Sequence, residues 1–227
     1  MYNKGKFIHW GRLDVGGKWI TFEGIGGSGK TTQLNLLHSY LKKRSIDVIL
    51  TKEPGGTVIG EKLRELLVNN LEIKLERLSE LFLFEADRHE TIKKIVKPNI
   101  KAGKFVISDR GIDGSVAYQG FGREIDLEVI DYLTSLATEN KQPDLTILID
   151  IDPEIAQQRI ANRNNVDIDK FDLEQLQFQA NVRKGFLYMA KQNPKRIVTV
   201  DGTLAIEDLH QKIVTLIKDF SKDVDIL

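Results

Sequence analysis

The sequence has no cysteine among its 227 residues, which excludes disulfide bonds, thiolate catalysis and thiolate metal sites. It has only four histidines, and their positions show no metal-ligand spacing. No apolar run reaches the roughly 18 residues that a membrane-spanning helix needs. Residues 1–17 also lack the apolar stretch of a secretory signal. We therefore expect a soluble, cytoplasmic protein that does not bind membranes.

The chain also lacks an excess of either charge. Its 33 lysines and arginines offset 33 aspartates and glutamates, whereas proteins that bind duplex DNA usually carry a basic excess. Nucleic acid is therefore not an expected partner. Hydrophobic residues make up 41% of the chain, enough for the core of one large domain.

Short apolar runs alternate with longer segments of helical periodicity. Five runs are β-branched or aromatic at consecutive positions, as in strands that are covered on both faces. These runs are residues 19–22, 48–50, 105–108, 145–149 and 197–200. Strand–helix alternation specifies right-handed crossovers and a parallel sheet. The sequence therefore predicts an α/β fold, with a five-stranded parallel sheet flanked by helices.

Other segments suggest how the domain is organised. Residues 75–102 are apolar on more than one helical face, which indicates burial against something besides the sheet. The polar segment 162–170, between two helices, is either a mobile loop or a surface connection. We interpret residues 1–17 as a polar extension and residues 18–227 as a single domain.

Residues 24–31, Gly-Ile-Gly-Gly-Ser-Gly-Lys-Thr, match the phosphate-binding pattern G-x-x-x-x-G-K-[ST] between a strand and an amphipathic helix. Glycines let successive N–H groups point at phosphate oxygens, and the helix N-terminus adds partial positive charge. Lys30 would reach the β- and γ-phosphates of ATP, and the Thr31 hydroxyl would ligate Mg²⁺. The expected ATP-binding residues are Gly24, Ile25, Gly26, Gly27, Ser28, Gly29, Lys30, Thr31 and Thr32. This motif predicts a three-layer fold of the P-loop NTPase type.

A P-loop alone does not distinguish a motor, a switch and a kinase. A guanine-specific switch needs Asn-Lys-x-Asp, and the nearest stretch, residues 140–144, is one residue too long. The small size leaves little room for the extra strands of a helicase or a transporter ATPase. A small-molecule kinase remains.

Four segments resemble the thymidylate kinases, in order, over roughly residues 18–220. They are residues 22–32, 51–64 with Glu-Pro-Gly-Gly-Thr, 84–88 with Phe-Glu-Ala-Asp-Arg, and 109–120 with Asp-Arg and Ala-Tyr-Gln-Gly. The resemblance implies transfer of the ATP γ-phosphoryl group to dTMP, giving dTDP and ADP, by a Mg²⁺-dependent homodimer. It also implies that residues 162–170 are a lid whose closure excludes water.

The chemistry of a nucleoside monophosphate fits these motifs. Its second pKa is about 6, so the attacking oxygen is already anionic at neutral pH and needs no general base. Cations must instead hold two anions in line, which predicts arginines rather than a catalytic histidine. By resemblance, Arg64 and Arg110 would hold the acceptor phosphate and Arg163 would touch phosphates. The expected catalytic residues are Lys30, Asp109, Arg110 and Arg163, and Asp109 would anchor Mg²⁺ with Thr31.

The resemblance also implies a thymine site. Phe84 would stack on the base and Arg88, four residues later on the same helix face, would donate to its O4. Ser115 and Gln119 would read the base edge. Without their motifs, Phe84 would be interpreted as a core-packing residue, and Arg64 and Arg110 as partners in surface ion pairs.

Glu53 has two interpretations. In deoxynucleoside kinases a Glu-Pro after the second strand supplies a base for a sugar hydroxyl, whereas in thymidylate kinases the matching glutamate supports the sugar and metal. We therefore keep as alternatives a deoxynucleoside kinase and a relative that acts on another deoxynucleoside monophosphate. A nucleotide-binding or regulatory protein without catalytic activity is a third alternative.

The sequence departs from the family at Gly26, where an aspartate or glutamate is usual. That acid would accept a hydrogen bond from the acceptor's 3′-hydroxyl, a contact worth roughly 1–3 kcal/mol. Asp-Lys-Phe-Asp at residues 169–172 likewise stands for the usual Asp-Arg-aromatic-Glu. Our hypothesis from the sequence is a kinase with weakened sugar recognition.

Overall fold

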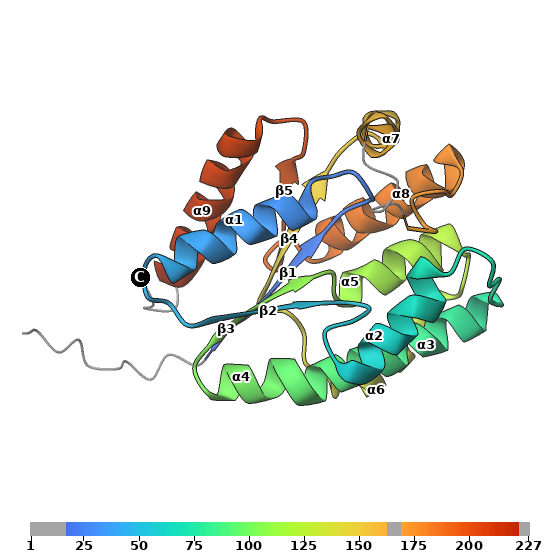
Figure 1. Ribbon diagram of the computed structural model, residues 1–227, viewed down its shortest axis with the longest axis horizontal. Coiled ribbons are helices and arrows are strands. Elements are labelled where there is room, and N and C mark those ends of the chain that lie inside the picture. Colours follow the sequence, from blue (N-terminus) through green and yellow to red (C-terminus); the bar gives the residue numbers. More distant parts are fainter. Residues whose placement is uncertain (1–16, 163–168, 223–227) are drawn as a thin grey trace, which may run out of the picture.

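The computed structural model describes residues 17–162 and 169–222 of the chain (Figure 1). Five strands form one parallel sheet in the order β2-β3-β1-β4-β5. They are β1 (Trp19–Glu23), β2 (Val48–Lys52), β3 (Phe105–Asp109), β4 (Leu145–Asp150) and β5 (Ile197–Asp201). All five predicted strands are confirmed, and each extends one or two residues further at its carboxyl end. Those extra residues are polar, so an apolar run does not reveal them.

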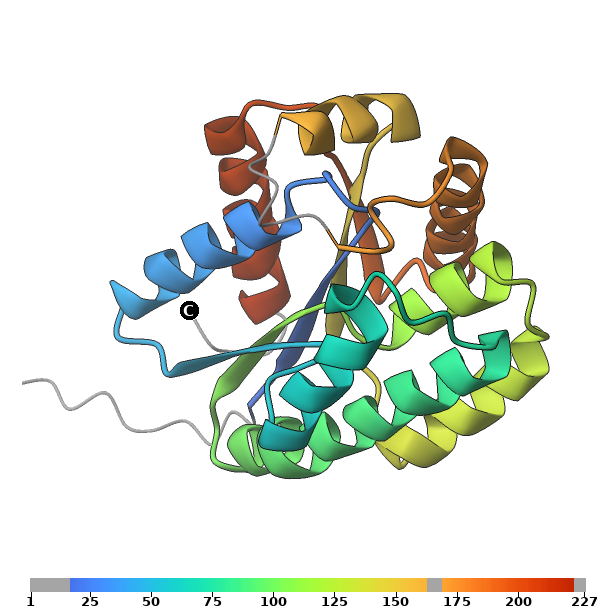
Figure 2. The same cartoon turned by 45° about the vertical axis from the view of Figure 1, so that its right-hand side comes forward.

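Helices cover both faces of the sheet, which confirms the predicted α/β fold of three layers (Figure 2). The α-helices are α1 (Lys30–Lys42), α2 (Val58–Arg64), α3 (Arg77–Thr91), α4 (Lys97–Lys101), α5 (Ile112–Ser115), α6 (Leu127–Thr138), α7 (Pro153–Ala161), α8 (Leu176–Gln192) and α9 (Ile206–Lys222). Three π-helical turns continue α2, α3 and α5: η1 (Glu65–Asn69), η2 (Ile92–Val96) and η3 (Val116–Gly122). Within the described ranges, no helix combines the length and the apolar character needed to cross a bilayer.

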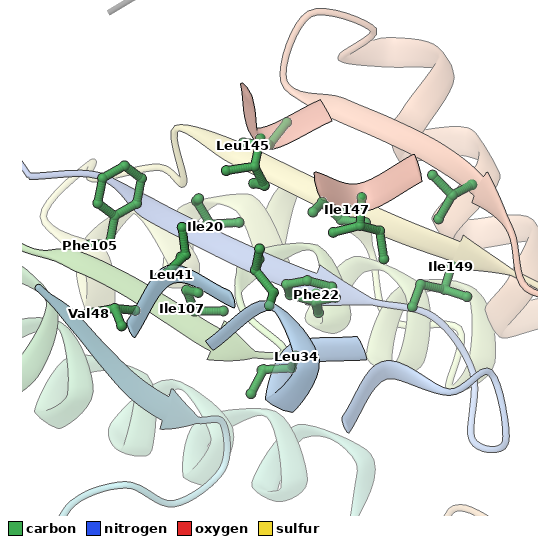
Figure 3. Close-up of a cluster of buried hydrophobic side chains, with 14 of the residues drawn as sticks. Ile20, Phe22, Leu34, Leu41, Val48, Phe105, Ile107, Leu145, Ile147 and Ile149 are labelled. Atoms are coloured by element: carbon green, nitrogen blue, oxygen red, sulfur yellow. The ribbon is translucent and has the colours of Figure 1, made fainter. Parts of the chain in front are cut away.

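The core on one side of the sheet joins α1 and α9 to the central strands (Figure 3). Leu34 and Leu41 of α1 pack with Ile20 and Phe22 of β1 and with Ile107 of β3, and all five side chains are buried. These leucines lie on the apolar face of the amphipathic helix predicted after the P-loop, and this face anchors α1 to the sheet. Because the P-loop leads directly into α1, this packing also fixes the P-loop on the sheet.

The segment that the sequence marked as apolar on several faces becomes α3, η2 and α4. Ile92 and Val96 pack under β1 and β3, while α3 lies against α2 and α6. Leu78 and Phe82 of α3 stay exposed, at 45% and 51%. The expectation of contacts besides the sheet is therefore met by helix packing, and part of the apolar surface remains uncovered.

Candidate active site

The candidate site lies at the carboxyl edge of the sheet, where β1, β2 and β3 end side by side. In open parallel sheets this edge is the usual place for ligands. A cavity of about 240 Å³ is present there. Its walls come from the P-loop, the loop after β2, helix α3, the segment from β3 to η3, and residues 169–172.

The P-loop curls through backbone conformations that favour glycine. Gly24, Gly27 and Gly29 have φ values of 142°, 75° and 95°. Gly29 caps α1 without any side-chain hydrogen bond, so the first N–H groups of the helix are available to an anion. This is the backbone geometry that the motif predicts.

Lys30 is almost fully buried at the floor of this loop. Its Nζ donates to the carbonyl oxygens of Gly24 and Ile25, each at 3.0 Å. Burial, together with the nearby Arg110 guanidinium, lowers the pKa of Lys30 to about 8, while the Asp109 carboxylate opposes the shift. The lysine is thus a desolvated cation, which a bound polyanion would stabilise.

Thr31 and Asp109 meet beside Lys30. The Thr31 hydroxyl donates to Oδ2 of Asp109 at 2.8 Å, and both residues line the cavity. Asp109 is the last residue of β3, one position beyond the predicted strand end. A hydroxyl and a carboxylate oxygen are hard ligands of the kind that Mg²⁺ binds.

Arg110, the residue after Asp109, adopts a left-handed backbone conformation with a φ of 73°. Its guanidinium donates to the Gly24 carbonyl at 3.1 Å and to the Tyr118 hydroxyl at 2.9 Å. It also lies 4.7 Å from the centre of the Tyr118 ring. A non-glycine residue in this conformation costs about 1–2 kcal/mol, a strain typical of functional sites. The arginine is therefore held beside the P-loop by both backbone and side-chain contacts.

Glu23, at the end of β1, lies behind Arg110. Its Oε2 is 3.8 Å from the guanidinium, and its Oε1 accepts from the N–H groups of Gly111 and Gly114. Complete burial raises the pKa of Glu23 to about 8, although Arg110 acts in the opposite direction. This glutamate therefore ties the start of α5 to β1.

Arg88 is the centre of a buried polar cluster under the acceptor side of the cavity. Its Nε donates to Glu53 at 2.9 Å and its Nη1 donates to Ser115 at 2.9 Å and to Glu85. Its Nη2 donates to the Gly111 carbonyl at 3.1 Å. Burial raises the pKa of Glu53, while Arg88 opposes the shift. These bonds fix the plane of the guanidinium before any substrate arrives.

The remaining predicted acceptor residues line the same cavity. The side-chain amide of Gln119 donates to Oε1 of the buried Glu80 at 3.0 Å. Arg64 donates to the Pro54 carbonyl at 2.9 Å, and the Phe84 ring lies 6.0 Å from the ring of Phe171.

Residues 22–213 match the family model for thymidylate kinase. The chain belongs to the thymidylate kinase family. It is 46% identical over 205 residues to the thymidylate kinase of Sulfurihydrogenibium sp. (strain YO3AOP1), covering 90% of this chain and 98% of that protein. It is 41% identical over 196 residues to the thymidylate kinase of Kosmotoga olearia, covering 86% of this chain and 93% of that protein.

A solved structure agrees with these relatives. The crystal structure of thymidylate kinase from Ehrlichia chaffeensis superposes with a TM-score of 0.73 at 38% sequence identity. The match covers 89% of this chain and 99% of the other. Membership of the thymidylate kinase family makes this chain a kinase of nucleotide biosynthesis, and the P-loop NTPase type of fold is confirmed.

The structure gathers most of the residues predicted for a thymidylate kinase site into one cavity. These are Gly26, Gly27, Gly29, Lys30, Thr31, Thr32, Glu53, Arg64, Phe84, Arg88, Asp109, Arg110, Ser115 and Gln119. Gly24, Ile25 and Ser28 do not line the cavity and are instead buried within the P-loop. Arg163 and most of the predicted lid, 162–170, lie outside the described residues, as do residues 1–16 of the predicted extension.

The family motifs did not predict site roles for Tyr118, Asp169, Phe171 or Asp172, which also line the cavity. The sequence pattern that marks the last three is Asp-Lys-Phe-Asp, the short motif at residues 169–172 that overlaps the end of the polar segment. Phe171 is buried and contacts the Tyr118 ring edge-on at 5.4 Å. It brings the two aspartates to the cavity.

Proposed function

We propose that this chain transfers the γ-phosphoryl group of ATP to dTMP, giving dTDP and ADP. One observation carries the proposal: a single cavity contains both the P-loop cation Lys30 and the acceptor-side cations Arg64 and Arg110. Two anionic nucleotides can therefore meet in one place. The names of the relatives supply the identity of the acceptor.

The cations in the cavity suit a reaction between two anions. The acceptor phosphate is a nucleophile at neutral pH because its second pKa is about 6. Lys30 would hold the triphosphate. Arg110, whose guanidinium donates to the Gly24 carbonyl, would orient the acceptor phosphate toward that triphosphate. Arg64, anchored on the Pro54 carbonyl, would neutralise the far side of that phosphate. This reaction requires no histidine, and the described residues that line the cavity include none.

Thr31 and Asp109 are the residues that would hold Mg²⁺. Within the described part of the chain, no group of three or more acidic or histidine side chains could hold a metal by itself. Mg²⁺ at such kinase sites needs only one or two protein oxygens, because substrate phosphates and water complete its shell. When bound, the ion would neutralise charge on the phosphates during transfer.

Thymine would lie between Phe84 and the Arg88 cluster. Four hydrogen bonds orient the Arg88 guanidinium, and one Nη2 N–H remains for the O4 atom of the base. Gln119, held by Glu80, would present its amide to the base edge.

The surroundings of Glu53 favour a supporting role over that of a general base. One oxygen of its carboxylate is ion-paired with Arg88, so this oxygen is not available to accept the proton of a sugar hydroxyl. Its other oxygen, Oε1, has no hydrogen-bond partner among the described residues, so it could still accept from a bound sugar or water. This second oxygen is the feature that keeps the deoxynucleoside kinase as an alternative.

We also infer that the enzyme is a homodimer. Large apolar side chains stay exposed on two packed helices: Leu78 and Phe82 on α3, and Val129, Tyr132 and Leu136 on α6. Their spacing of three or four residues puts those of each helix on one face. An apolar patch of this kind is typical of a subunit interface.

The test is ADP release in a coupled assay with Mg-ATP and each candidate acceptor. We expect strong stimulation by dTMP, weaker stimulation by dUMP and the other deoxynucleoside monophosphates, and none by thymidine. A response to thymidine would support the deoxynucleoside kinase, and a preference for another monophosphate would reassign the acceptor. Silence with every acceptor would refute the proposal.

A further inference from the structure

The space beside Gly26 in the P-loop is filled by the side chain of Asp172. A Cβ atom built on Gly26 would overlap Oδ1 of Asp172 and would lie 3.1 Å from its Cγ. Both residues line the main cavity. A carboxylate from a distant part of the sequence thus occupies the position that a P-loop side chain would take.

This position of Asp172 is determined by several contacts. The backbone N–H of Asp172 donates to the side-chain Oδ1 of Asp169 at 2.9 Å, which closes a tight turn. Phe171, inside the turn, is buried against the rings of Phe84 and Tyr118. The N–H of Lys170 donates to the Val68 carbonyl at 3.2 Å. The turn is thereby anchored to η1, α3 and η3, and it projects the carboxylate toward the P-loop.

The charge of Asp172 limits what it can bind. Its carboxylate favours the charged form of Lys30, but it repels the phosphates that Lys30 and Arg110 attract. A favourable partner on an acceptor nucleotide must therefore be a hydrogen-bond donor. Thymidine monophosphate offers two donors, the N3–H of the base and the 3′-hydroxyl of the sugar. Gln119 and Ser115 lie at the proposed base end, which leaves the sugar hydroxyl.

We infer that Asp172 accepts a hydrogen bond from the 3′-hydroxyl of the acceptor nucleotide and supplies the carboxylate that the P-loop lacks at Gly26. This inference rests on the proposed function. It replaces the hypothesis of weakened sugar recognition with one of relocated recognition. Gly26 is then required, because any side chain there would displace Asp172.

The first test compares two ligands on three proteins by isothermal titration calorimetry, without ATP or Mg²⁺. The ligands are dTMP and its 3′-deoxy analogue, and the proteins are the wild type, Asp172→Ala and the control Asp208→Asn on the exposed start of α9. We expect Asp172→Ala to bind dTMP about 10- to 100-fold more weakly, and the 3′-deoxy analogue within about twofold of wild type. The control should match the wild type with both ligands.

A second test moves the carboxylate. Gly26→Asp combined with Asp172→Ala should recover most of the dTMP affinity that Asp172→Ala loses, whereas Gly26→Asp alone should not raise dTMP affinity above that of the wild type because the two side chains collide. If Asp172→Ala proves unstable in a thermal melt, Asp172→Asn keeps the shape and should show a smaller loss, again confined to dTMP.

Three results would overturn the inference: equal losses for both ligands, unchanged dTMP affinity, or, in a separate titration with Mg-ATP, a loss confined to Mg-ATP binding. The first would make Asp172 a packing residue, and the last would make it a partner of the metal. A wild-type protein that binds no dTMP at all would instead refute the proposed function, so the two failures are distinguishable.

Discussion

The Nε atom of Arg88 lies 2.9 Å from Oε2 of Glu53, and both side chains are 3% exposed. The arginine also pairs with Glu85, so one buried cation neutralises two buried carboxylates. The residue predicted to read thymine is therefore also part of the framework of the fold. Binding and stability are linked at this position.

Arg88→Met should lower the free energy of unfolding by about 3–5 kcal/mol, because it leaves two buried carboxylates without their cation. Urea denaturation at neutral pH would measure this change. Arg44→Met, at an exposed site where the guanidinium lies 3.7 Å from the Tyr40 ring centre, should cost less than about 1 kcal/mol. Adding Glu53→Gln and Glu85→Gln to Arg88→Met should restore part of the loss. An Arg88→Met protein as stable as its Arg44→Met counterpart would contradict this account.

Nucleotide binding should take up protons near pH 8. The pKa of Lys30 is lowered to about 8 in the free protein, so the lysine is partly neutral there, and a bound triphosphate would raise that pKa. Calorimetric titration with ATP in buffers of different ionisation enthalpy would measure the uptake. The proton uptake by Lys30 should fall toward zero at pH 6, where the lysine is already charged. The affinity for ATP should decrease as the pH rises above 8.

Lys30→Arg is the matched control for proton uptake, because a guanidinium stays charged throughout this range. The variant should show no uptake at pH 8 if it still binds ATP. Equal uptake in the wild type and the variant would assign the proton to another group.

Arg110→Gly should separate catalysis from stability. Losing the guanidinium should lower kcat by about 10²-fold or more. The free energy of unfolding should change by no more than about 1 kcal/mol, because glycine accepts the left-handed conformation at this position without strain. Glu23 should not become an unpaired buried charge, because its pKa of about 8 lets it bind a proton. Steady-state kinetics and urea denaturation on the same samples would measure both effects. A kcat equal to that of the wild type, or an unfolded variant, would contradict the catalytic role of Arg110.

Phe82→Glu should convert a dimer into a monomer, because it puts a charge into the exposed apolar patch on α3 and α6. Sedimentation equilibrium would show the mass falling to the 25.8 kDa of one chain. Val58→Glu, at a residue of α2 that is 82% exposed, is the control and should stay dimeric. A wild-type protein that already sediments as a monomer would contradict the proposed dimer interface.

The sequence predicted the fold and the P-loop because both depend on local patterns. Runs of apolar residues fix the strands, and the spacing of glycines with Lys30 and Thr31 fixes the loop. The strand ends were underestimated because Glu23 and Asp109 are charged, and hydrophobicity gives no signal for a charged residue inside a strand. The position of Asp172 beside Gly26 was not predicted, because it depends on tertiary packing of Phe171 between two distant helical segments.

The strand order β2-β3-β1 places three loop exits next to one another, and each exit carries a different part of the site. Glu53 follows β2, Arg110 follows β3 and the P-loop follows β1. Deleting one residue from β3 would turn every later side chain of that strand to the opposite face and would pull Asp109 away from Thr31. Evolution of this enzyme can therefore change exposed helix positions outside the site and the interface more readily than it can change the lengths of these three neighbouring strands.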